Sequence, residues 1–341
     1  MGRKKLLVVV VAVLLGEVLF VAPRMVAAQA SAASAPRWYK GNTHTHTLNS
    51  DGENTPDEVV RWYREHDYQF LVITDHEYLT DPAPLNALFG RDGRFLLIPG
   101  QEVTGRAEGK PVHVNQIGAK KVVMPVSLPT IFDVLQRDVT LVHEAGAIAQ
   151  INHPNFGWAL SGDDLARVEH ATLVEIWNGH PMVNNLGGGG TPSAEAMWDA
   201  ALTAGNHLFA IADDDAHHFK PEHLADPASA APGRGWIYVR AAALTEADIL
   251  AAIRRGDFYA SSGVELADIQ STSSSVTVSI KATTYSRYTT QFIGARGTVL
   301  AVSTSNPAVY TVTGAETYVR AKVIESNGKM AWTQPAFVNR R

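Results

Sequence analysis

The sequence predicts an α/β protein with a mostly parallel sheet, followed by a smaller all-β region. As far as about Gly263, short apolar runs alternate with amphipathic helical patterns, and beyond it apolar and polar residues alternate within each run. Strands of a parallel sheet read as continuous apolar runs because helices cover both faces, whereas alternation is typical of half-buried antiparallel strands. About seven strands in the first region fit a barrel of β/α units.

The first element is a predicted secretory signal peptide at residues 1–30. It has a basic start, an apolar run from Leu6 to Leu15, and the small-x-small sequence Ala28-Gln29-Ala30 before Ser31. The alternative is a membrane anchor, but the polar and proline residues from Glu17 to Arg24 interrupt the run before it reaches the ~20 apolar residues of a spanning helix. We therefore expect cleavage, export to the periplasm or the exterior, and no membrane span in the mature chain.

A linker of small residues at 31–36 precedes the predicted strands and helices. Thr55 and Thr245 are the expected N-cap residues of two helices that begin directly after them, and Gly256 ends the second helix. The apolar runs that we expect to be strands lie at 70–74, 95–99, 112–118, 147–151, 173–177, 208–212 and 236–239.

The chain divides at Gly263 into two predicted domains. Residues 37–263 would form the α/β domain, and residues 264–341 a small β-sandwich-like domain. The second region contains no histidine and few acidic residues, so we assign no chemistry to it.

Charge and cysteine content narrow the possible functions. The net charge is −5, and no run of Lys or Arg follows the first few residues, so a broad nucleic-acid-binding surface is not expected. Nucleic acid stays open only as a substrate bound locally. Because the chain has no cysteine, it has no disulfide, and any transition-metal site must consist of histidine and carboxylate ligands.

Histidine and acidic residues follow the predicted strands, and these define a candidate metal site. His44 and His46 are spaced i, i+2, which places them on one side of an extended segment, and Asp215 and His217 repeat that spacing. The carboxyl ends of barrel strands meet on one face, so these side chains should converge there. Bound divalent cations would offset the desolvation and repulsion of so many titratable groups. The candidate ligands are His44, His46, Asp51, His76, Glu102, His113, His153, Asp215 and His217.

The ordered segments HTHTLNSDG, TDH, GQE, HVN, INHP and DDDAH, within residues 40–263, resemble the signature segments of the PHP (polymerase and histidinol phosphatase) superfamily. The signal peptide, the EIWNG and RRGDFYASSG segments and the appended β region are similar to its carbaryl-hydrolase branch, which is called CehA/McbA-like. The resemblance implies a distorted seven-stranded (β/α) PHP-type barrel that holds two or three divalent ions.

The resemblance also implies how the candidate ligands divide. One ion would take His44, His46, Glu102 and Asp215, a second, bridged by Glu102, would take His113 and His153, and a third would take Asp51, His76 and His217. Imidazole and carboxylate ligands without thiolate suit zinc or manganese, with iron as a further possibility, and argue against calcium. The residues expected to act in catalysis are Glu102, Asp215 and His217.

The implied function is metal-dependent hydrolysis of a small-molecule ester by a hydroxide that bridges the ions. Phosphomonoesters or phosphodiesters are the expected substrates. One alternative is a carbamate or aryl ester hydrolase, and another, from a different class, is an exported metal- or glycan-binding protein. No Gly-x-Ser-x-Gly segment occurs, so acyl-enzyme chemistry has little support. The oligomeric state stays open.

Three further acids adjoin the candidate ligands: Asp75, Asp213 and Asp214. They either orient imidazole rings from outside the ligand set or are turn carboxylates. Asn178 either contacts substrate or is a loop residue.

Overall fold

A computed structural model describes residues 1–2 and 35–338 of the chain. Residues 35–338 belong to one compact unit. The predicted signal peptide, apart from Met1 and Gly2, and residues 31–34 of the linker lie outside the described residues. Within the part of the chain that is described, none of the helices has the length and apolar character that crossing a membrane requires.

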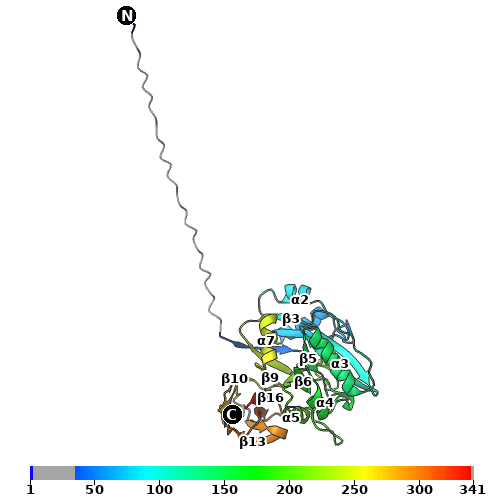
Figure 1. The fold of residues 1–341 in the computed structure, drawn as a ribbon, viewed down its shortest axis with the longest axis vertical. Helices are drawn as coiled ribbons and strands as arrows, with labels where there is room; N and C mark the ends of the chain where they lie inside the picture. The colour runs from blue at the N-terminus through cyan, green and yellow to red at the C-terminus, as the bar shows by residue number, and fades with distance from the viewer. Residues whose placement is uncertain (3–34, 339–341) are drawn as a thin grey trace. The chain divides into compact units, whose positions relative to one another are not determined.

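The predicted α/β class is confirmed. The region up to Gly263 has nine strands and seven α-helices among its described residues, and helix α3 packs against strands β3, β4 and β5 (Figure 1). The strands are β1 (Arg37–Asn42), β2 (Phe70–Ile73), β3 (Leu96–Ala107), β4 (Lys110–Ile117), β5 (Ile148–Ile151), β6 (Leu173–Asn178), β7 (Phe209–Asp213), β8 (Trp236–Ala241) and β9 (Phe258–Ser261). The helices are α1 (Pro56–Glu65), α2 (Pro82–Phe89), α3 (Ile131–Glu144), α4 (Gly162–Arg167), α5 (Ala194–Ala204), α6 (Pro221–Leu224) and α7 (Glu246–Arg255).

Both predicted helix starts are confirmed by their capping contacts. At α1, the Thr55 N–H donates to Glu58 Oε2 at 3.0 Å, and at α7 the Asp248 N–H donates to Thr245 Oγ1 at 3.2 Å. Gly256 ends α7 with a φ of 76°, a left-handed conformation that glycine adopts without steric cost.

The sheet is mixed, in the order β8-β1-β2-β3-β4-β5-β6-β7. The β1–β2, β2–β3, β5–β6 and β6–β7 pairs are parallel, whereas β4 is antiparallel to both of its neighbours. The cause is the two-residue turn Glu108-Gly109 between β3 and β4, where both φ values are positive, at 54° and 74°. Two such residues make the tight hairpin turn that joins antiparallel strands.

The segments that follow β1 and β7 contact each other through backbone hydrogen bonds. Thr45 and Ala216 form a parallel bridge, the His46 N–H donates to the Ala216 carbonyl at 2.9 Å, and the Asp215 N–H donates to the His44 carbonyl at 3.0 Å. The segments beyond the carboxyl ends of β1 and β7 therefore lie side by side. These segments carry the candidate ligands His44, His46, Asp215 and His217.

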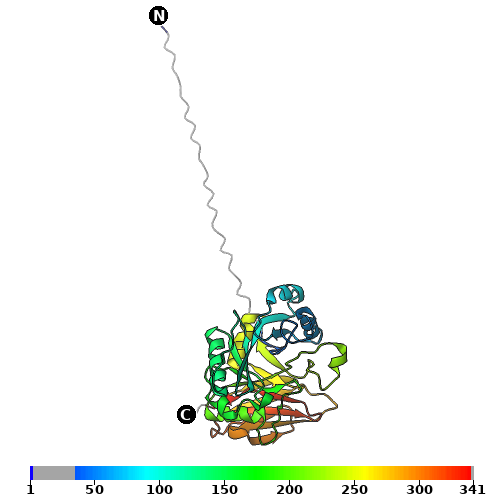
Figure 2. The same ribbon diagram turned by 90° about the vertical axis from the view of Figure 1, so that its right-hand side faces the viewer.

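As predicted, the described part of the C-terminal region consists of strands, with a short 3₁₀ turn at Ala295–Gly297 (η2); another described 3₁₀ turn, Phe156–Trp158 (η1), lies in the first region. Its strand β16 pairs with β9, so that β12, β13, β15 and β16 continue the large sheet past Gly263, while β10, β11 and β14 form a separate sheet. Figure 2 shows these orange and red strands against the green and yellow elements of the first region. The domain boundary at Gly263 stays a prediction. The strands are β10 (Leu266–Ser271), β11 (Ser275–Ile280), β12 (Tyr288–Gly294), β13 (Thr298–Ser303), β14 (Ala308–Thr311), β15 (Tyr318–Glu325), β16 (Met330–Thr333) and β17 (Ala336–Phe337).

Candidate metal centre

The structure brings all nine candidate ligands together. They form four overlapping groups, in each of which the potential ligand atoms lie within 4.8 Å of one another. The groups are His46, Asp51, His76 and His217; His44, His46 and Glu102; His44, His153 and Asp215; and Glu102, His113 and His153. Seven of these residues line a cavity of about 270 Å³, while His44 and His46 lie buried at its floor.

Glu102 lies at the centre of this cluster. It is 1% exposed and belongs to β3, which runs antiparallel to the strand that carries His113. Its Oε1 is 2.9 Å from His113 Nδ1 and 3.4 Å from His153 Nε2. Its Oε2 is 3.2 Å from the Nε2 atoms of both His44 and His46 and 3.3 Å from His76 Nδ1. One carboxylate thus contacts five imidazoles.

Asp215 is the second carboxylate of the cluster. Its Oδ1 is 3.2 Å from His44 Nε2 and 3.3 Å from His46 Nε2, and its Oδ2 accepts a hydrogen bond from Asn178 Nδ2 at 3.1 Å. Burial, the largest single effect, opposes ionisation of both Asp215 and Glu102, but His44 and the other surrounding histidines together outweigh it and hold the pKa of each carboxyl well below its usual range. Both carboxylates are therefore ionised at neutral pH and can act as ligands.

Asp51 lies at the open end of the cavity, with 55% of its side chain exposed. Its Oδ1 is 3.4 Å from both His46 Nδ1 and His217 Nε2, and its Oδ2 is 3.5 Å from His76 Nε2. The group that would hold the predicted third ion is thus the most exposed of the four.

Two ligand residues have backbone conformations that side chains other than glycine rarely adopt. The φ of His153 is 22° and that of Asp215 is 49°. Such conformations cost of order 1–3 kcal/mol each and persist where the surroundings impose them, commonly at functional sites. Here they occur at the second residue after β5 and at the second residue after β7, and both side chains line the cavity.

Glu175 on β6 orients two of the histidines. Its Oε1 is 2.6 Å from His44 Nδ1, and its Oε2 accepts the backbone N–H of His153 at 2.6 Å. A carboxylate on the far nitrogen of a ligating imidazole sets its tautomer and its direction. Glu175 is the first residue of the EIWNG segment, but its contact with His44 was not predicted, because the sequence around a buried strand residue does not indicate which distant residue it contacts.

The three additional acids have separate places. Asp75 accepts hydrogen bonds from the Thr47 N–H at 2.7 Å and from Ser50 Oγ at 2.9 Å, which holds the turn after His46. Asp213 accepts one from Gln150 Nε2 at 3.0 Å, beneath the cluster. Asp214 accepts a hydrogen bond from the Arg234 N–H at 2.6 Å, so it stabilises the loop that contains Arg234 and does not orient an imidazole ring.

Sequence reasoning also missed His180, which follows β6 and lines the cavity beside Asp215 and His217. Burial lowers its pKa to about 4, so the ring is neutral at pH 7. The rule that identified the other ligands, a histidine just past a strand end, applies to His180 as well. The remaining side chains around the cavity are Thr104, Arg106, Pro111, Phe156 and Met182.

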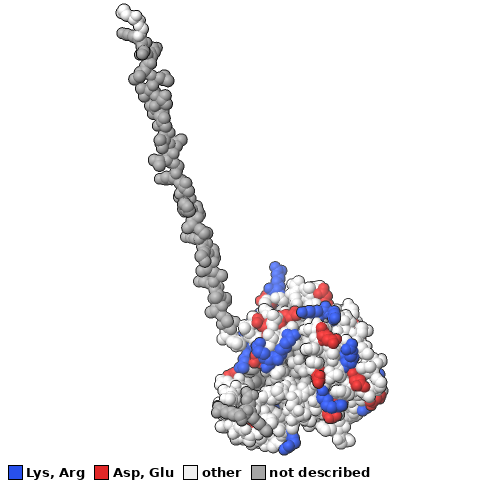
Figure 3. Space-filling view, in the orientation of Figure 1, with Lys and Arg blue, Asp and Glu red and all other residues white. Residues whose placement is uncertain are grey.

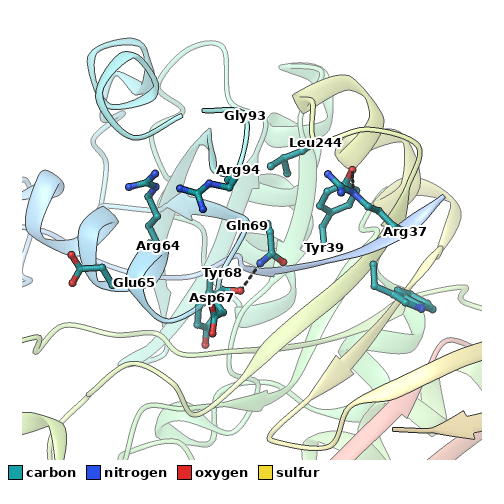
Figure 4. Close-up of a pocket in the computed structure, with 11 residues that line it drawn as sticks. Arg37, Tyr39, Arg64, Glu65, Asp67, Tyr68, Gln69, Gly93, Arg94 and Leu244 are labelled. Atoms are coloured by element: carbon teal, nitrogen blue, oxygen red, sulfur yellow. Dashed lines mark hydrogen bonds between the residues drawn. The ribbon is translucent and has the colours of Figure 1, made fainter. Parts of the chain in front are cut away.

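A second cavity, of about 510 Å³, lies where β1, β2 and β3 begin (Figure 4). Its arginines already have partners: Arg64 and Arg94 each lie 2.7 Å from an Asp92 oxygen, and Arg37 Nε donates to Tyr39 Oη at 2.8 Å. Side chains at this end of parallel strands generally serve stability. On the face shown in Figure 3, basic and acidic side chains are interspersed, so no extended basic surface appears there.

The donor set fits divalent cations. Each of the four groups combines imidazole nitrogens with carboxylate oxygens, and no thiolate is available. Such ligands are typical of zinc, manganese and iron.

Comparison with known proteins identifies structural neighbours only. No protein-family model and no curated protein sequence matches the chain. A two-domain protein from Bacteroides vulgatus, containing a predicted PHP-like metal-dependent phosphoesterase, has 18% identity and a TM-score of 0.50, over 85% of this chain and 90% of that one. A candidate metal-dependent phosphoesterase from Bifidobacterium adolescentis has 16% identity and a TM-score of 0.40, over 56% and 93%.

A lesion-specific endonuclease from Pyrococcus furiosus has 11% identity and a TM-score of 0.38, over 64% of this chain and 56% of that one. At these sequence identities and TM-scores, only the protein from Bacteroides vulgatus supports a conclusion, and that conclusion concerns the fold alone. The chain thus shares its fold with a two-domain protein that contains a PHP-like domain.

Proposed function

We propose that this chain is an exported metal-dependent phosphoesterase of the PHP superfamily. The observation that carries the proposal is Glu102, a buried carboxylate whose two oxygens lie within 3.4 Å of five imidazole nitrogens. A buried cluster of this kind is costly without cations to neutralise and order it. The shared fold with a PHP-like protein agrees with this proposal.

The finer fold follows from the same reasoning. We infer that β1 to β7 form a closed, distorted seven-stranded barrel, and the bridge between Thr45 and Ala216 supports its closure. The region after Gly263 would be an accessory β domain.

The candidate ligands would divide among two or three ions as the resemblance implies. Glu102 would bridge the ion held by His44, His46 and Asp215 to the ion held by His113 and His153, and the Asp51 group would hold a third. Zinc or manganese is the proposed metal. When bound, such ions lower the pKa of a water ligand toward neutrality and stabilise negative charge on phosphoryl oxygens.

The protein's own residues supply orientation and a binding surface. Glu175 holds His44 and the backbone of His153 in place, so that these ligands need little reorganisation. Arg106 is the one lysine or arginine that lines the cavity in the described part of the chain, and it offers positive charge to an anionic ester. Phe156, Pro111 and Met182 add apolar side chains to the lining of the cavity, where they can contact the organic part of an ester.

Metal analysis together with an ester panel tests this function. Purified protein should contain about two or three zinc or manganese ions per chain and should hydrolyse p-nitrophenyl phosphate or bis(p-nitrophenyl) phosphate, with activity lost on chelation and restored by metal. Hydrolysis of aryl carbamates or carboxyl esters alone would favour the carbaryl-hydrolase alternative. Bound metal without turnover of any ester would favour a binding protein.

Export is tested separately by N-terminal sequencing of the protein recovered outside the cytoplasm. The mature chain should begin near Ser31. A chain that retains Met1 in that fraction would overturn the proposal.

A further inference from the structure

His180 is a cavity residue that does not belong to any of the metal-binding groups among the described residues. It comes from the loop directly after β6, and its ring lies 5.5 Å, centroid to centroid, from His217 and 6.3 Å from Phe156. The ring therefore lies beside a candidate ligand and an apolar side chain of the same cavity.

Hydrogen bonds hold the loop that carries this ring. The His180 N–H donates to Asn178 Oδ1 at 2.8 Å, and the same Asn178 side chain donates to Asp215. Asn185 fixes the loop from the other side, since it accepts the Asn178 N–H at 2.9 Å and donates to the Asn178 carbonyl at 2.8 Å. A group held this way pays little entropy when it binds a ligand.

The hydrogen bonds of the ring also assign its tautomer. His180 Nδ1 accepts the backbone N–H of Met182 at 3.2 Å, so in the neutral ring the proton is on Nε2. No group in the described part of the chain is hydrogen bonded to Nε2, and this nitrogen is not among the fully buried polar atoms that lack a partner. His180 thus presents an unused N–H donor at an accessible place in the cavity.

The geometry points to His180 as a substrate-binding residue whose Nε2–H donates a hydrogen bond to an oxygen of the phosphoryl group. This assignment rests on the proposed phosphoesterase function, because it takes a tetrahedral oxyanion as the ligand. Arg106, from β3, also lines the cavity outside the ligand groups and can donate, whereas the hydroxyl of Thr104, the neighbouring polar lining residue, already lies 2.6 Å from His76 Nδ1. Together, His180 and Arg106 would bind those phosphoryl oxygens that are not bound to metal ions. Phe156 and Met182 would contact the organic part of the ester.

Two amide substitutions separate this role from a structural one. In His180→Asn, the side-chain oxygen can take the place of Nδ1 and accept the Met182 N–H, but nothing reaches the position of Nε2. In His180→Gln, an amide N–H reaches the position of Nε2, while the Nδ1 acceptor is lost. His143→Phe is the matched control, because His143 stacks on His170 at 4.5 Å and does not line the cavity.

The readouts are the affinity of the metal-loaded protein for inorganic phosphate, by calorimetry, and kcat/KM for p-nitrophenyl phosphate. His180→Asn should weaken phosphate binding and lower kcat/KM by about 10- to 100-fold, which is the usual range for one hydrogen bond to a charged group. His180→Gln should keep most of both, His143→Phe should leave both unchanged, and all three variants should retain the metal content of the wild type.

The outcomes separate this assignment from the proposed function. If His180→Gln loses more than His180→Asn, or if either loses metal in parallel with phosphate affinity, His180 serves the structure and the assignment is wrong while phosphoesterase activity stands. If the wild type binds phosphate in a His180-dependent way but cleaves no phosphoester, the donor assignment holds and the proposed function fails. If the wild type does not bind phosphate at all, both fall.

Discussion

At the scale of single residues, the centre depends on how Glu102 and Asp51 differ. Glu102 is buried and contacts at least one imidazole in each of the four groups. Asp51 is half exposed, and among the described residues its contacts with imidazoles are those to His46, His76 and His217. A carboxylate that bridges two ions offers one oxygen to each, so its loss weakens both sites. A peripheral carboxylate affects one ion at most.

Glu102→Gln should therefore remove metal from two sites and lower kcat by about 1,000-fold or more, in keeping with the several kcal/mol that metal ions contribute to hydrolysis. Metal content per chain and kcat for a phosphate ester are the measurements. Asp51→Asn is the matched control and should lose at most one ion. A Glu102→Gln protein with full metal content and near-normal turnover would contradict the assignment of Glu102 as the bridging ligand.

At the scale of elements, α3 carries a buried acid against the β3–β4 hairpin. Asp138 is fully buried; its Oδ1 accepts the Val126 N–H at 3.3 Å, and its Oδ2 has no hydrogen-bond partner among the described residues. Burial raises the pKa of Asp138 to about 7, although the Val126 hydrogen bond works against this. Between its unfolded and folded pKa values, the folded state keeps a proton that the unfolded chain has released. The free energy of unfolding therefore falls as the pH rises from about 4 to about 7.

Asp138→Asn should remove this dependence. We expect Tm to fall less between about pH 5 and pH 8 in the variant than in the wild type. The contribution of Asp138 to the change in the free energy of unfolding is a few kcal/mol at most. The scans are made on metal-depleted protein, because metal ligands also titrate in this range. The exposed change Asp163→Asn should leave the wild-type pH profile in place; an unchanged profile in Asp138→Asn would show that Asp138 is ionised in the folded protein throughout.

At the scale of the whole molecule, a buried ion pair joins the first region to the C-terminal strands. Asp199 on α5 accepts hydrogen bonds from Arg320 Nε at 2.8 Å and Nη2 at 2.6 Å, and from Tyr318 Oη at 3.0 Å. Arg320 is 1% exposed, and its Nη2 also lies 2.9 Å from Glu195 Oε1, so removal of Asp199 would leave the buried guanidinium with one carboxylate partner instead of two.

Asp199→Ala should accordingly lower the free energy of unfolding by about 3 kcal/mol, the lower end of the range for a broken buried pair, because Glu195 still faces the guanidinium; urea denaturation measures it. Asp163→Ala breaks an exposed pair with Arg167 and should cost less than about 1 kcal/mol. Equal effects of the two substitutions would mean that the Asp199 pair does not hold the two regions together.

The sequence alone determined the α/β class, three helix boundaries and the convergence of the nine candidate ligands. Each of these depends on local information: continuous apolar runs, capping residues, and the rule that side chains just past parallel strands share one face. His44 and His46 lie side by side for this reason, and Glu102 reaches them because β2 pairs in parallel with β3. By the same rule His180 was within reach of sequence reasoning, but its neutral tautomer was not.

Only the tertiary structure decided the features that depend on distant partners. The antiparallel hairpin at Glu108-Gly109 lacks the usual Asn-Gly or Asp-Gly signal, so the chain around it reads as two further strands of a parallel series. The pairing of β16 with β9 joins residues that are 70 to 74 positions apart, and the contact between Glu175 and His44 joins residues that are 131 positions apart. A strand edge and a buried carboxylate accept many partners of suitable shape, and it is the packing of the whole chain that selects one.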